Sequence, residues 1–333
     1  MRIDLQPNDT WTALSEQYRA ELAKRLPIFA EAGMQVQVYQ NYAHALWEIT
    51  QSLAKLFAHK KTIAIAGQGE LLFEPIATAF SEDGYTLKNL TREEIDHPSS
   101  WFDAVQTDLL FILYVQDDAV SGRLRNNEGL LAAVKDKRVF KISISHSAYR
   151  YQPLERPAPF EVRILSLGSE RALMIAGERC RIVPPVARIL PWPKADETSI
   201  ASELVFAEPD ARERILAFEA ALPEGFKPFF KSDEPRVFDR AAIYSSEFDG
   251  SAVMDELARL GGFQKSKPGL SSELESTSPC RWENPRIKDW LLEREGSEEI
   301  VRGLVLIDAA AVNGDLPAYL TSAARHLRKL QNG

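Results

Sequence analysis

Short runs of apolar residues alternate with longer segments of helical periodicity through the first half of the chain. Four runs have the length and composition of buried strands, and they cover residues 62–66, 109–115, 139–145 and 160–166. Apolar residues recur at helical spacing before or between these runs, which predicts helices over residues 41–59, 70–80 and 127–135. Strands that alternate with helices form mostly parallel sheets covered on both faces. The predicted fold class is therefore α/β.

The pattern changes at a polar stretch with two prolines, residues 191–199, which predicts a linker or a hinge. Beyond it we expect an α+β order, with helices over 209–222 and 251–260, strands over 241–245 and 301–308, and a last helix whose apolar face carries Leu316, Tyr319, Leu320, Ala323, Leu327 and Leu330. We therefore predict a large domain over residues 1–198 and a smaller domain over residues 199–333.

The net charge, the apolar runs and the cysteine content disfavour several kinds of binding partner and indicate the cellular compartment. The formal net charge of -8 disfavours binding to the phosphates of DNA or RNA, which are recognised by basic surfaces. No apolar run approaches the ~18 residues of a membrane span, and the polar first residues lack the apolar core of a signal peptide. Cys180 and Cys280 make neither a disulfide framework nor a zinc site. We expect a cytoplasmic protein without nucleic-acid, membrane or metal partners.

Four short segments carry candidate chemistry, and they are GQGE at 67–70, DDAVSG at 117–122, HSAY at 146–149 and SERALMIAGERCRI at 169–182. In this order they resemble the Gly-x-Asp-Glu, Asn-Asn-Pro-Thr-Gly, Asp-x-Ala-Tyr and Ser-Lys-Ala-x-x-Leu-Ala-Gly-x-Arg-x-Gly motifs of the fold-type-I aminotransferases that use pyridoxal phosphate (PLP). The resemblance is greatest to the branch that contains histidinol-phosphate aminotransferases. It implies a large α/β domain, a smaller second domain, PLP as cofactor, and an active site at the interface of a homodimer.

Arg171 stands where that family has its cofactor lysine. Enzymes of the family bind PLP as a Schiff base on this lysine, which later moves the substrate proton. A guanidinium stays protonated at any ordinary pH and is a poor nucleophile. Arg171 can therefore pair with an anion, but it can neither form the Schiff base nor act as the base.

Two further polar groups of the family's site are replaced. The resemblance puts His146 in the place of the aspartate that supports the protonated pyridine nitrogen, and a neutral histidine supplies no fixed negative charge. Ala119 takes the place of the asparagine that contacts the ring hydroxyl. Three losses at matched positions predict a pseudoenzyme that does not transaminate.

Other parts of the family's site are kept. Arg179 matches the arginine that binds the cofactor phosphate, and Tyr149 matches the tyrosine over the ring hydroxyl. Gly67 and Gly69 keep a loop before a predicted helix, where backbone amides and the helix dipole favour an anion. The resemblance therefore implies that a small anionic or phosphorylated ligand, PLP included, can bind without a covalent link.

Two matches concern the second subunit and the substrate. Tyr39, in the segment VYQ, is similar to the tyrosine of the family's Arg-Tyr-Pro segment, which reaches the neighbouring subunit's site. Arg302 takes the place of the arginine that binds the substrate carboxylate. The matched residues also have structural alternatives, which are an ion pair for Arg171, a tight turn for Gly67, and packing for Tyr39.

The leading hypothesis is a dimeric scaffold or small-anion binder with an aminotransferase fold. One alternative is an active PLP enzyme whose lysine lies elsewhere, with Lys141 and Lys194 as the nearest candidates. Another is a transferase that uses pyridoxamine phosphate and needs no lysine link. The last is an unrelated α/β protein in which the motif matches are coincidental.

Overall fold

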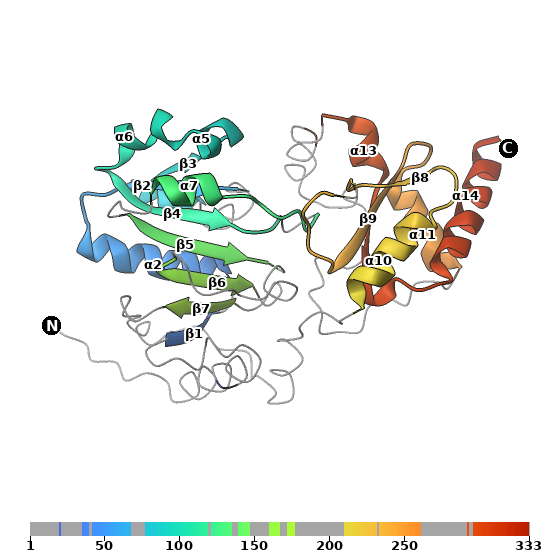
Figure 1. Ribbon diagram of the computed structural model, residues 1–333, viewed down its shortest axis with the longest axis horizontal. Coiled ribbons are helices and arrows are strands. Elements are labelled where there is room, and N and C mark those ends of the chain that lie inside the picture. Colours follow the sequence, from blue (N-terminus) through green and yellow to red (C-terminus); the bar gives the residue numbers. More distant parts are fainter. Residues whose placement is uncertain are drawn as a thin grey trace. The chain divides into compact units, whose positions relative to one another are not determined.

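The computed structural model describes two compact units. The described residues are 20, 35–39, 42–67, 77–118, 121–134, 139–146, 160–166, 172–176, 210–231, 233–260, 292 and 296–332, with the backbone alone for 35–38, 77 and 172–176. One unit comprises Met1–Asp118 and Leu124–Phe206, and the other comprises Ala119–Arg123 and Ala207–Gly333 (Figure 1). The predicted boundary between residues 198 and 199 lies outside the described residues and stays a prediction.

The first unit contains a seven-stranded sheet with the strand order β1-β7-β6-β5-β4-β2-β3. The strands are β1 (Gln35–Tyr39), β2 (Thr62–Ala66), β3 (Thr86–Asn89), β4 (Leu109–Val115), β5 (Phe140–Ser145), β6 (Val162–Ser166) and β7 (Ala172–Ala176). The five neighbours β3, β2, β4, β5 and β6 are parallel, whereas β7 runs antiparallel to both β6 and β1. The prediction of an α/β fold with a mostly parallel sheet is confirmed.

Helices cover both faces of this sheet, as Figure 1 shows. They are α2 (Tyr42–Leu56), α4 (Ala77–Glu82), α5 (Arg92–Asp96), α6 (Phe102–Val105) and α7 (Glu128–Ala133), with a 3-10 turn η2 (Pro98–Ser100). Leu46 and Ile49 of α2 pack against Ile63 and Ile65 on one face. On the other face the apolar side chains of α5, α6 and α7 pack with Ala64, Ile112 and Tyr114. The two apolar cores hold the strand ends in place.

The predicted buried strands agree with the structure, but three strands were not predicted. Strand β3 and helix α5 lie between the predicted helix over 70–80 and the predicted strand over 109–115, and the capping box of Thr91 and Glu94 starts that helix. The four residues of β3 are half-buried or exposed, so they lack the apolar run that marks the inner strands. Strands β1 and β7 pair with each other at the edge of the sheet.

The second unit contains a three-stranded antiparallel sheet with the order β10-β9-β8. Its elements are α10 (Ala211–Ala220), β8 (Phe226–Pro228), β9 (Arg240–Ser245), α11 (Gly250–Arg259), α13 (Glu298–Gly303), β10 (Leu304–Asp308), a 3-10 turn η4 (Ala309–Ala311) and α14 (Leu316–Asn332). Helices α11 and α14 pack against each other. The predicted α+β order of small elements is present in this unit.

Two predictions for the second unit were wrong in detail. The strand expected over 301–308 begins only at Leu304, because the Ser297 side chain accepts a hydrogen bond from the Ile300 amide and starts α13. The helix ends at Gly303, and this residue must be glycine because an added Cβ would lie 1.9 Å from the Ser245 carbonyl oxygen. Leu330 does not join the apolar face of α14, since it is 63% exposed.

Candidate functional site

The carboxyl ends of the parallel strands form the candidate site, since ligands of open α/β sheets bind at this edge. Gly67 follows β2, Asp117 and Asp118 follow β4, and His146 follows β5. The structure therefore brings two of the predicted site residues, Gly67 and His146, to one edge of the sheet. The two buried aspartates were not among the predicted site residues, although their position after a buried strand is the signal that points to them.

A carboxylate joins the ends of β4 and β5. Asp117 is fully buried, and its Oδ1 accepts a hydrogen bond of 2.8 Å from the backbone amide of His146. The imidazole ring of His146 meets the Tyr42 ring edge to face, with the ring centroids 5.7 Å apart. Tyr42 begins helix α2, which is distant in sequence, so nothing in the local pattern indicated this contact. His146 is thus fixed at its backbone by Asp117 and flanked at its ring by Tyr42.

Gly67 has a structural reason to be glycine. Its φ is 141°, and an added Cβ would lie 2.5 Å from Cβ and 2.8 Å from Cγ2 of Val115 on the neighbouring strand β4. An L side chain rarely adopts this backbone conformation, and none would fit against Val115. Its backbone conformation and its closeness to Val115 account for the glycine, whereas the anion-binding loop that would also need Gly69 stays a prediction because Gly69 lies outside the described residues.

Tyr39 packs inside the first unit. Its side chain is 2% exposed and belongs to the apolar core on the α2 face. Its ring meets the His44 ring edge to face at 5.6 Å between centroids. These contacts account for the tyrosine within one chain, and its predicted role toward a partner subunit stays a prediction.

The remaining predicted residues are divided between the second unit and the undescribed part of the chain. Arg302 lies on α13 and is exposed, and its predicted role in carboxylate binding stays a prediction. The others lie outside the described residues, and they are Gly69, Ala119, Tyr149, Arg171, Arg179, Cys180, Lys194 and Cys280.

Lys141 is held far from this edge. It is the second residue of β5, 5% exposed, and its Nζ lies 3.1 Å from both the Val139 carbonyl oxygen and Oε1 of Glu161. His146 follows five residues later, which corresponds to about 16 Å of strand. The buried ion pair with Glu161 therefore fixes this amine toward the amino end of the sheet.

The other described lysines of the first unit also lie elsewhere. Lys55 belongs to α2, Lys60 and Lys61 precede β2, and Lys88 belongs to β3 and pairs with Glu94 at 2.6 Å. In the part of the edge that the structure describes, no lysine follows β2, β4, β5 or β6. These residues do not fit PLP held through a Schiff base, because that link needs a primary amine at the strand ends.

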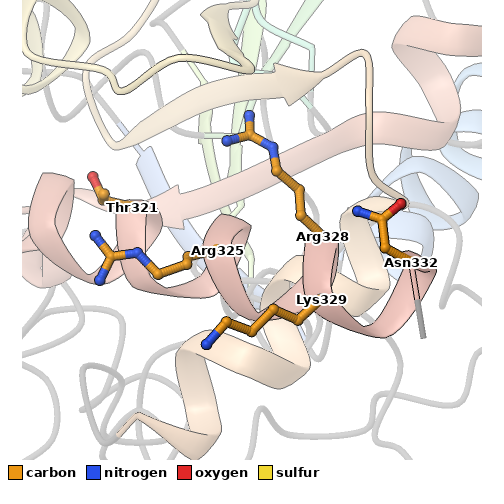
Figure 2. A pocket seen from close by; sticks show the side chains of 5 residues that line it. All are labelled: Thr321, Arg325, Arg328, Lys329 and Asn332. Carbon is orange, nitrogen blue, oxygen red and sulfur yellow. The ribbon is translucent and has the colours of Figure 1, made fainter.

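The second unit carries an open groove on helix α14 (Figure 2). Its volume is about 530 Å³, and its lining residues are Thr321, Arg325, Arg328, Lys329 and Asn332. Arg328 donates hydrogen bonds of 2.9 and 3.0 Å to the carboxylate of Glu247. Cations near the carboxyl end of a helix also complement the helix dipole. The groove contains no residue that the sequence analysis singled out.

Two features of the described residues bear on membrane and metal partners. No described helix is long and apolar enough to cross a membrane. Within the same residues, no three histidine, cysteine, aspartate or glutamate side chains are grouped as a metal site would require.

The chain has the fold of the fold-type-I PLP-dependent transferases, as its similarity to solved structures shows. A NifS-like protein aligns over 95% of this chain and 88% of its own, with a TM-score of 0.64 and 13% identity. Ureidoglycine-glyoxylate aminotransferase from Bacillus subtilis aligns over 97% and 87%, with a TM-score of 0.60 and 13% identity. Alanine-glyoxylate aminotransferase from Nostoc sp. aligns over 97% and 90%, with a TM-score of 0.59 and 9% identity.

These identities show the fold alone. No protein-family model matches the chain, and no curated protein matches it by sequence. The similarity therefore extends over both units of the chain without assigning it an activity.

Proposed function

We propose that this chain is a PLP-transferase-fold protein that does not transaminate and acts as a homodimeric scaffold or as a binder of a small anion. The observation that carries the proposal is Arg171 at the position of the cofactor lysine. A guanidinium cannot replace the amine in either of its two roles, since it neither forms the Schiff base nor accepts the substrate proton.

The geometry of Lys141 supports the proposal. A displaced lysine would have to reach the carboxyl ends of β4 to β6, but Lys141 is buried in an ion pair with Glu161 at the other end of β5. Moving it would break the contacts of its Nζ with the Glu161 carboxylate and the Val139 carbonyl oxygen. Lys194 is the remaining candidate for a displaced lysine.

The residues that match the family's phosphate contacts support binding of an anion that does not react. Arg179 and the loop from Gly67 to Gly69 would contact a phosphate, and His146 would present an imidazole beside it. PLP itself is one such ligand, bound non-covalently. The histidinol-phosphate branch stays the predicted relationship, while the solved structures of similar fold include proteins named as NifS-like and as glyoxylate aminotransferases.

A second candidate function is an active transferase that uses a displaced lysine or pyridoxamine phosphate. Two of the solved structures of similar fold are named as aminotransferases, which favours this candidate. It requires an electron sink at the pyridine nitrogen, and His146 supplies no fixed negative charge for this purpose.

A titration with PLP tests the proposal directly. Purified protein is mixed with PLP, the visible absorbance of a protonated Schiff base is followed, and borohydride reduction is followed by mass spectrometry of the peptides. We expect no specific labelled lysine. One stoichiometric label would overturn the proposal. Lys141→Arg is the matched control, because it keeps the cation beside Glu161 and removes the primary amine.

The variant Arg171→Lys distinguishes a binder of a small anion from a scaffold that binds none. If the phosphate contacts persist, the new amine lies beside a bound PLP and the variant gains the visible absorbance that the unmutated protein lacks. If the chain is a scaffold alone, the variant gains nothing. Sedimentation tests the remaining part, since a monomer would contradict a homodimeric scaffold.

A further inference from the structure

Strands β5 and β6 differ from the other inner strands of the parallel sheet in the character of one face. On the α2 face they carry the apolar side chains of Ile142, Ile144, Val162 and Ile164. Beside the apolar Leu165, the opposite face carries four polar side chains that are at most 9% exposed, namely Lys141, Ser143, Ser145 and Arg163. Parallel strands buried on both faces are normally apolar on both. The polar groups of this face therefore need partners.

Arg163 has no hydrogen-bond or ion-pair partner among the residues that the structure describes. It is 9% exposed, and its Nε is buried without an acceptor. Its guanidinium lies over the Phe160 ring at 5.7 Å from the centroid. The neighbouring cation on this face, Lys141, differs in having its own carboxylate, that of Glu161.

Tyr114 brings a second donor without a partner to the same place. It is fully buried, and its hydroxyl has no hydrogen-bond partner within the described structure. Its ring also packs against Phe160, with the centroids 5.3 Å apart. Tyr114 and Arg163 are both in register with Ser143, which lies between them on β5. Their Cα atoms are thus two strand spacings apart, about 10 Å, and both side chains meet one ring.

The electrostatics of this face favour an anion. Burial lowers the pKa of Arg163, which is the sign of a cation that has lost water without gaining a counter-ion. Burial raises the pKa of Tyr114, and the Glu161 charge raises it further, so its hydroxyl stays protonated and can donate. A buried charge without a partner is strongly unfavourable, and a guanidinium is suited to bind two oxygens of one carboxylate or phosphate.

We propose that Arg163 and Tyr114 form an oxyanion-binding site on the face of β4, β5 and β6, which takes a small molecule that carries a carboxylate or phosphate group. The guanidinium binds two of its oxygens and the Tyr114 hydroxyl donates to one of them. The site lies about three residues, or 10 Å, before the strand end that carries His146. It is independent of the proposed function, which concerns the strand ends.

Thermal unfolding with inorganic phosphate and with succinate tests this site. A ligand that binds only the native state raises the unfolding temperature along a saturable curve, whereas excluded salts act without saturation. We expect a saturable rise for the unmutated protein with at least one of the two ions, measured against chloride at equal ionic strength. Arg163→Met should abolish the part of the saturable response that Arg179→Ala retains, and Tyr114→Phe should weaken the apparent affinity of that part several-fold. Arg92→Met removes an exposed arginine of the same unit and should leave the curve unchanged.

The unfolding temperature without phosphate or succinate distinguishes two sources of the oxyanion. If a free anion fills the site, Arg163→Met removes an uncompensated buried charge and should raise the unfolding temperature in chloride. If a carboxylate of the chain or of a second copy pairs with Arg163, the same variant leaves that carboxylate alone and lowers the unfolding temperature. The second result, or an unmutated protein without a saturable response to either ion, overturns the proposal.

Two further variants cover the cases in which Arg163→Met does not fold or the strand ends also bind phosphate. Tyr114→Phe removes a single hydroxyl, so it reports on the site even if Arg163→Met does not fold. Arg179→Ala concerns the strand-end hypothesis alone. The part of the saturable response that depends on Arg163 should persist in this variant, and any part that it removes but Arg163→Met keeps belongs to the strand ends, so failure of either proposal can be told from failure of the other.

Discussion

The two units each bury an arginine, but they surround it differently. In the second unit the Arg236 guanidinium donates two hydrogen bonds of 2.6 Å to Glu219, and the two side chains are 3% and 8% exposed. The rings of Phe230 and Phe238 lie 4.8 and 4.9 Å from it. In the first unit Arg163 keeps the aromatic contact and lacks the carboxylate. Aromatic packing positions the guanidinium in both units. Only in the second unit is its charge balanced by a carboxylate among the described residues.

The largest expected effect comes from removing the carboxylate of the Arg236–Glu219 ion pair. Glu219→Ala leaves the Arg236 guanidinium buried and uncompensated, so we expect a loss of about 3–5 kcal/mol in the free energy of unfolding. Urea denaturation followed by circular dichroism measures it. Glu213→Ala removes an exposed glutamate of the same helix α10 and should change the free energy by less than about 0.5 kcal/mol. If Glu213→Ala lowered the free energy of unfolding as much as Glu219→Ala does, the stabilising role of the Arg236–Glu219 ion pair would be contradicted.

A smaller effect follows when both charges are removed together. In the double variant Arg236→Met with Glu219→Leu, no buried charge remains, and such replacements are often neutral or stabilising by about 1–4 kcal/mol. We expect it to recover most of the stability that Glu219→Ala loses. The measurement is the coupling free energy of a double-mutant cycle with the two single variants. A double variant as unstable as the worse single one would show that the pair is needed for packing.

The smallest effect concerns an exposed pair. Hydrogen bonds from Arg328 hold the pKa of Glu247 below its ordinary value, although the two side chains are 42% and 39% exposed. A lowered folded-state pKa adds stability above the unfolded-state pKa, and this stability is lost as the pH falls through the folded-state pKa. Glu247→Gln should therefore cost a small fraction of the Glu219 effect at neutral pH and nothing in acid. Urea titrations at several pH values and at high salt, which screens the pair, check this.

The strand pattern of the first unit could be predicted from the sequence because its inner strands are short apolar runs. Strands β2 and β4 match the predicted residues 62–66 and 109–115. The edge strands β1 and β3 were missed, as was β7 between β1 and β6, since their place depends on pairing partners distant in sequence. Helix α13 was missed because its start depends on one hydrogen bond that the Ser297 side chain accepts from the Ile300 amide.

The candidate site could be predicted only in part. Gly67 and His146 lie at the expected edge of the sheet because each directly follows a strand. The contacts of Asp117 and Tyr42 with His146 join three distant segments, which no local pattern reveals. The alternation of Lys141, Ser143 and Ser145 was visible in the sequence as a departure from buried parallel strands. That Arg163 finds no carboxylate in the described chain required the structure itself.

The five residues from Ala119 to Arg123 belong to the second unit, although the rest of that unit begins at Ala207. The Gly122 carbonyl accepts a hydrogen bond of 2.8 Å from the Val237 amide, and the Arg123 guanidinium lies over the Phe229 and Phe230 rings. During synthesis this segment leaves the ribosome long before those neighbours do. The second unit therefore completes its fold late, around a piece of chain already made, and a fragment that starts after Phe206 lacks that piece.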